Sequence, residues 1–111
     1  MAIDDDLADR LRMVLQDEDN LTEQRMFGGL AFLVDRHMAV AASSKGGLML
    51  RVDPAELPAL LDLPHAHPFE MRGKELAGWL RIDDAGCADD DELRTWVRRG
   101  VAYARSLPPK E

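Results

Sequence analysis

Three apolar segments separated by short polar turns occupy the sequence from Arg25 to Val52. Gly28 to Val34 is almost continuously apolar, whereas Met38 to Ala42 and Leu48 to Val52 alternate in side-chain character. The turns are Asp35-Arg36-His37 and a Ser-Ser-Lys-Gly-Gly segment, whose glycines suit the positive φ angles of hairpin turns. Because strands joined by such short turns pair antiparallel, this stretch commits the chain to an antiparallel meander.

Apolar residues at helical spacing predict three helices. The first covers residues 4–16. The second begins at Asp53, because Pro54 suits the first helical position and Glu56 stands three residues after the cap, as in a capping box. The third begins after one of three consecutive aspartates at residues 89–91. It has the clearest apolar stripe, formed by Leu93, Trp96, Val97, Gly100, Val101 and Ala104.

Residues 65–68 are predicted to form a loop, residues 69–82 a second hairpin and residues 83–88 a connection. The expected order is therefore helix, three or four strands, helix, two strands, helix. Such an order favours an α+β fold, a two-layer sandwich of helices on a mainly antiparallel sheet. The 111 residues suit one domain covering residues 1–111.

The charge distribution argues against some classes of function. The net charge is −7, and residues 1–23 hold eight acidic residues against two arginines. An acidic protein repels phosphate backbones, so we expect no direct nucleic-acid binding. No apolar run approaches the ~20 residues that cross a bilayer, and the N-terminus is acidic where a secretion signal would be basic. With a single cysteine, Cys87, these features predict a cytoplasmic protein.

Several of these segments together resemble the N-terminal domain of the TfoX/Sxy family, named for regulators of natural competence. The motif Arg25-Met26-Phe27-Gly28-Gly29 precedes an apolar strand, as in that family. Phe69-Glu70-Met71, Gly78-Trp79-Leu80 and the last helix with Trp96 and Val97 follow in the same order. The similarity runs from about residue 23 to residue 109.

The resemblance implies an α-β(3)-α-β(2)-α domain of the secretion-chaperone-like type. The regulators that gave the family its name also carry a second, helical domain, which residues 1–111 do not contain. We therefore expect a single-domain member, to which their regulatory activity cannot be transferred whole. The family motif at residues 25–29 is the expected partner surface, with Phe27 either in the core or in the contact.

No residue set in the sequence predicts catalysis, a cofactor or a metal. His65 and His67 could bind zinc from one side of a strand, but Pro64 and Pro68 place them in a loop, and no second ligand pair completes a site. Cys87 has no neighbouring base and fits a small apolar residue better than a nucleophile. The glycine pairs lack the spacing of phosphate loops. We therefore expect no enzyme.

Two surface questions stay open at this stage. Arg94, Arg98 and Arg105 could face a nucleic acid or an acidic protein, although a solvated helix face is the simpler interpretation. Met26, Phe27 and Met38 suit either an adaptable binding surface or the core, and strand spacing favours the core for these three residues.

Two functional hypotheses follow. The first is a non-enzymatic protein-interaction module that docks on a partner protein, or on a second copy of itself, through the sheet and the segment after Phe27. The alternative is a small-ligand or metal-binding domain, which could in addition be a cryptic enzyme.

Overall fold

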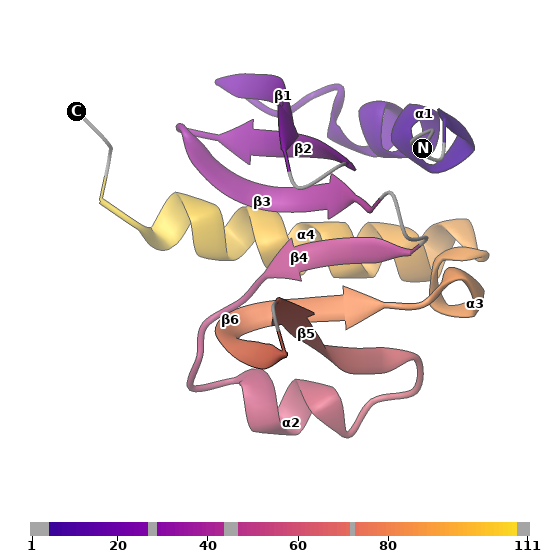
Figure 1. The fold of residues 1–111 in the computed structure, drawn as a ribbon. Helices are drawn as coiled ribbons and strands as arrows, with labels where there is room; N and C mark the ends of the chain where they lie inside the picture. Colours follow the sequence, from indigo (N-terminus) through magenta and orange to yellow (C-terminus); the bar gives the residue numbers. More distant parts are fainter. Residues whose placement is uncertain (1–4, 27–28, 44–46, 72, 109–111) are drawn as a thin grey trace.

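The computed structural model describes residues 5–26, 29–43, 47–71 and 73–108 of the chain. Six strands form one sheet in the order β1-β2-β3-β4-β6-β5, and every neighbouring pair is antiparallel (Figure 1). The elements in chain order are α1 Asp5–Leu15, β1 Leu21–Met26, β2 Gly29–Val34, β3 His37–Ala42, β4 Leu48–Arg51, α2 Leu57–Leu61, β5 Ala66–Met71, β6 Lys74–Ile82, α3 Asp84–Cys87 and α4 Asp90–Ser106.

The predicted α+β class and antiparallel sheet are confirmed, but the order α-β(3)-α-β(2)-α is wrong in two places. The first run has four strands, because residues 21–26 form the separate edge strand β1. Thr22, Glu23, Gln24 and Arg25 are all exposed on β1, so no apolar alternation marks it in the sequence. The predicted connection at 83–88 contains the short helix α3, which Asp83 caps by accepting a hydrogen bond from the Gly86 amide.

Two other boundaries also differ from the prediction. Helix α2 begins at Leu57 rather than at Asp53, because the Asp53 side chain accepts a hydrogen bond from Ala55 within a turn that precedes the helix. Strand β5 begins at Ala66, inside the predicted loop of residues 65–68. Pro68 is accommodated because β5 is an edge strand, where a missing amide hydrogen costs no ladder bond.

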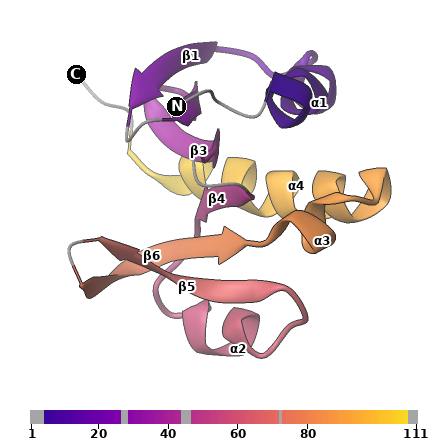
Figure 2. The ribbon, with the colours of Figure 1, turned by 45° about the vertical axis from the view of Figure 1, so that its right-hand side comes forward.

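Helix α4 covers the centre of the sheet. All six residues of its predicted stripe are buried, and they pack with β2, β3 and β4 (Figure 1). Gly100 lets the helix approach β3 closely, since a Cβ atom at this position would lie 2.5 Å from the Ala39 carbonyl oxygen. Helices α1 and α3 each adjoin α4 (Figure 2), and α2 packs beside β5 and β6.

The sheet separates two apolar clusters. The larger one joins α1, α2 and α4 to the sheet and includes the fully buried Phe32. The smaller one, on alternate positions of the strands, contains Ala31, Met38, Ala41 and Met49, with Leu33, Phe69 and Trp79 packed around it. The two clusters explain why every residue of β3 is buried, as expected for a central strand covered on both faces.

Candidate functional site

The family motif at residues 25–29 is only partly described by the structure. Arg25 is exposed near the end of β1, and Met26 ends that strand. Gly29 begins β2, and packing requires a glycine at this position because a Cβ atom would collide with the Ala42 carbonyl oxygen. Phe27 and Gly28 lie outside the described residues, so their role in partner contact stays a prediction. Met38, by contrast, is 7% exposed, which confirms the core interpretation for that residue.

The α4 arginines do not form a free basic face. Arg105 lies 2.8 Å from Glu18 and 3.4 Å from Asp35, and it also donates to the Asp19 carbonyl. Arg94 lies 3.2 Å from Asp91 on its own helix. Arg98 is exposed and makes no ion pair with any residue that the structure describes. Intramolecular carboxylates thus pair with two of the three arginines that the sequence singled out on this surface, and the Asp91 partner of Arg94 is itself highly exposed.

A cleft of about 600 Å³ lies between α1 and α4. At one end Arg10 joins the two helices through an ion pair of 2.9 Å to Asp90. The residues that line the cleft are Arg10, Met13, Val14, Leu15, Gln16, Asp17, Glu18, Asp90, Arg94, Val97, Arg98, Val101 and Ala102. The lining therefore mixes charged side chains with apolar ones, and among the apolar ones Met13 is exposed while Val97 and Val101 are buried.

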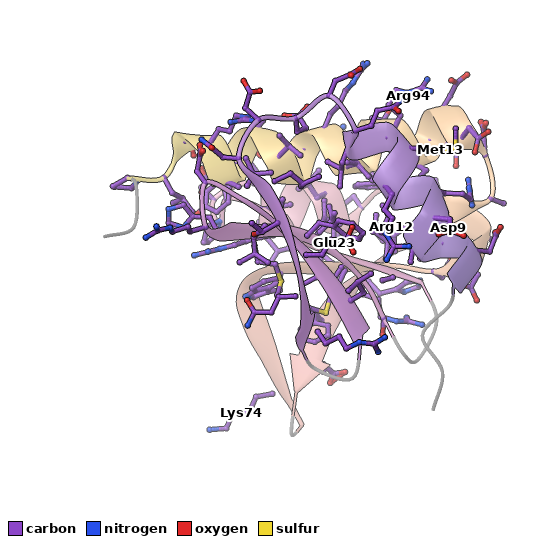
Figure 3. The ribbon with its side chains drawn as sticks, turned by 90° about the horizontal axis from the view of Figure 1, so that it is seen from above. Asp9, Arg12, Met13, Glu23, Lys74 and Arg94 are labelled. Carbon is purple, nitrogen blue, oxygen red and sulfur yellow. The ribbon has the colours of Figure 1, made fainter. Side chains whose placement is uncertain are left out.

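Met13 is the most exposed large apolar side chain in the described part of the chain, at 70%. It lies on α1 on the side where this helix adjoins α4, near Arg94 (Figure 3). The preceding residue, Arg12, points elsewhere: its guanidinium bonds both carboxylate oxygens of Glu23 on β1, each at 3.0 Å, and Asp9 at 2.9 Å. Helix α1 is thereby held against the edge strand while Met13 remains open to solvent.

A second group of side chains, which we call the arginine–aromatic cluster, consists of Arg51, Phe69, Trp79 and Tyr103. The Arg51 guanidinium carbon lies 5.9 Å from the centre of the Trp79 ring and 5.7 Å from that of the Tyr103 ring. Trp79 in turn lies 6.4 Å from Phe69 in a tilted arrangement. Three strands and α4 contribute to the cluster, and all four side chains are half-buried.

The two histidines considered as zinc ligands meet at Asp83. His67 Nε2 donates a hydrogen bond of 2.9 Å to Asp83 Oδ2, and His65 Nδ1 lies 3.0 Å from Oδ1. The hydrogen bond from His67 is the main cause that lowers the pKa of Asp83 below its ordinary value. His67 is in β5 rather than in a loop, which corrects the prediction. Within the described residues, no three histidine, cysteine or acidic side chains are arranged to hold a metal ion.

The remaining histidine and the cysteine are buried. His37 is 6% exposed, and its Nε2 donates to the Pro108 carbonyl at 2.6 Å, which ties the segment after α4 to β3. Burial raises the pKa of the Cys87 thiol to about 11. At neutral pH this thiol is protonated and inaccessible, which is the environment of a structural cysteine.

A smaller cleft of about 310 Å³ lies beside His65, on the opposite flank of α4 from the first cleft. It is lined by Leu63, Pro64, His65, Asp91, Glu92, Thr95, Trp96 and Arg99. Leu63 is 39% exposed and is the second exposed large apolar residue of the described chain. In the described structure, each cleft beside α4 therefore has one exposed apolar side chain at its edge.

Sequence reasoning missed both the α1–α4 cleft and the arginine–aromatic cluster. One signal for the cleft was present, because Met13 is an apolar residue outside the stripe of Leu7, Leu11 and Leu15 that faces the core. No comparable signal existed for the cluster, since Arg51 and Tyr103 are far apart in the chain and meet only through the position of α4.

The fold and these sites define a small α+β domain with two clefts beside α4, each lined by both charged and apolar residues. The family model for the TfoX N-terminal domain matches residues 13–104, and the chain belongs to this family. The family suggests a competence-related, regulator-like module. No curated protein matches the sequence. No helix in the described residues is long and apolar enough to cross a bilayer.

Proposed function

We propose that this domain is a non-enzymatic protein-interaction module of a competence-related regulator, and that a partner protein docks in the cleft between α1 and α4. The observation that carries the proposal is Met13, which is 70% exposed at the edge of this cleft. An exposed methionine at the edge of a cleft offers a flexible, polarisable side chain that adapts to different partners.

The chemistry of the cleft favours an amphipathic helix as the occupant. The exposed Met13 and the half-buried Val14 on α1 offer apolar contacts beside α4, and a third helix packs naturally against such a helix pair. Arg98 has no carboxylate partner in the described structure, and Arg94 has only the highly exposed Asp91. A partner helix whose apolar stripe is flanked by acidic side chains would complement these two arginines.

Crosslinking at Met13 tests this proposal directly. We would place a photoreactive phenylalanine analogue at residue 13 in the native host and map the crosslinked peptide by mass spectrometry. We expect a peptide from one specific protein, amphipathic in pattern and with carboxylates beside its apolar stripe. Crosslinks to this chain alone, or none above background, would contradict docking of a partner protein in this cleft.

A pair of matched variants controls for general surface effects. Met13→Asp and Leu63→Asp each place a carboxylate at an exposed apolar residue, on opposite flanks of α4. Binding of the identified partner should fall at least about tenfold in Met13→Asp and stay unchanged in Leu63→Asp, because a desolvated carboxylate is costly in an apolar contact. Equal effects of both variants would assign the loss to charge rather than to the cleft.

The surface expected from the sequence, at residues 25–29, remains a second proposal for partner contact. A Phe27→Ala variant that keeps its thermal stability but loses the partner would favour contact through that segment.

A further inference from the structure

The Arg51 guanidinium contacts two aromatic rings and has no carboxylate partner among the described residues. Its carbon lies over the rings of Trp79 and Tyr103, at 5.9 Å and 5.7 Å, which is within the range of cation–π attraction. Trp79 is the cross-strand partner of Arg51 on the neighbouring strand β6, while Tyr103 comes from α4. Contacts from two separate elements thus restrict the orientations of the side chain before any ligand arrives.

The hydrogen-bond donors of this cluster are not used within the described structure. The guanidinium carries five N–H donors in its plane, and a cation–π contact to a ring gives them no oxygen acceptor. Arg51 makes no hydrogen bond or ion pair with a described residue, and neither the Trp79 indole N–H nor the Tyr103 hydroxyl does so. The pattern differs from that of four other arginines, each bonded to a carboxylate: Arg10, Arg12, Arg94 and Arg105.

Like the exposed Arg98, Arg51 has no carboxylate partner among the described residues, but unlike Arg98 it is half-buried against two aromatic rings. The cluster combines one fixed positive charge with an indole donor and a hydroxyl, and in the described structure it contains no acid. Planar guanidinium groups bind carboxylates and phosphates through two parallel hydrogen bonds. Phe69, 6.4 Å from Trp79, extends the apolar surface beside these donors.

We propose that Arg51 anchors a binding site for a small ligand that carries a carboxylate or phosphate group on an apolar or aromatic body. The anionic group bonds the guanidinium plane, and the body rests on Trp79 and Phe69. This site shares no residue with the α1–α4 cleft, so the inference stands apart from the proposed function. The net charge of −7 disfavours unspecific binding of anions to this protein. Saturable binding of an anion would therefore indicate a specific site.

Nuclear magnetic resonance of the full chain provides the first test. The labelled protein is titrated separately with benzoate, phenyl phosphate and, as a neutral control, benzamide. We expect saturable shifts of the Arg51 Nε–H and Trp79 indole signals with the two anions and none with benzamide. A stronger response to phenyl phosphate would identify a phosphate ligand, and a stronger response to benzoate a carboxylate ligand. The absence of saturable shifts with both anions would overturn the proposal.

Two arginine-to-lysine variants distinguish the contribution of the planar guanidinium donors from that of positive charge alone. Arg51→Lys keeps the positive charge but loses the planar donors, and we expect the dissociation constant to rise about tenfold or more. Arg99→Lys is the matched control, because Arg99 also lies over a tryptophan, 5.5 Å from the centre of the Trp96 ring, but outside the cluster. Unchanged affinity in Arg51→Lys, or equal losses in both, would refute the assignment. The wild-type titration decides the question even if Arg51→Lys does not fold.

Discussion

The contact between α4 and β3 makes Gly100 the most informative position for testing the fold. We predict that Gly100→Ala destabilises the protein, although alanine is the better helix former. A Cβ atom at residue 100 would lie 2.5 Å from the Ala39 carbonyl oxygen and 3.0 Å from Val40 Cγ1. Because the first of these atoms belongs to the backbone of a central strand, a side-chain rotation cannot relieve the overlap.

The magnitude follows from two opposing effects. Replacing a mid-helix glycine with alanine contributes about 1 kcal/mol of stability through helix propensity. Restoring ordinary contact at Ala39 requires α4 to move by about 0.9 Å, from 2.5 Å to the 3.4 Å at which contacts become ordinary. Inserting a methyl group into a packed core costs about 1–3 kcal/mol, and the backbone contact favours the upper part of this range. The expected net loss is therefore about 1–2 kcal/mol.

Urea unfolding followed by circular dichroism measures this difference. A melting curve should show a decrease of roughly 4–16 °C, since each kcal/mol lowers the melting temperature of a domain near this size by about 4–8 °C. Ala102→Gly on the exposed side of the same helix is the control, with an expected loss of about 1 kcal/mol from propensity alone. A Gly100→Ala protein as stable as the wild type, or more stable, would show that α4 is not in close contact with β3.

Two further predictions concern titratable groups. The native pKa of Asp83 is lowered, so its ionised form stabilises the folded protein at pH values above the unfolded pKa of about 3.9, and this stability is lost as the pH falls through the native pKa. The Asp83→Asn variant should therefore show a flatter pH dependence of the unfolding free energy in this acidic range. An unchanged slope would contradict the contact between Asp83 and His67. Because the pKa of Cys87 is about 11, its thiol should react with a disulfide reagent at pH 8 at least about 100-fold more slowly in the native protein than in denaturant, and comparable rates would show that it is accessible.

Residue patterns predicted the elements of this fold well where one face of an element meets the core. The stripe of α4 is buried at every predicted position, from Leu93 to Ala104, because helical periodicity directly encodes which face avoids water. Edge strand β1 was not predicted separately, since its exposed polar residues carry no alternation. The helix start at Leu57 was misplaced because Asp53 forms a local turn that mimics a helix cap.

Family membership and the α+β class were thus determined by the sequence alone, through short-range patterns and an ordered set of motifs. The tertiary structure alone decided which distant side chains meet: Arg51 with Tyr103, and Met13 beside the valines of α4. Periodicity specifies that a helix face is apolar, but it does not specify the neighbouring element or the position at which the two adjoin. The candidate sites of this protein depend on that placement, and for this reason they became visible only in the folded chain.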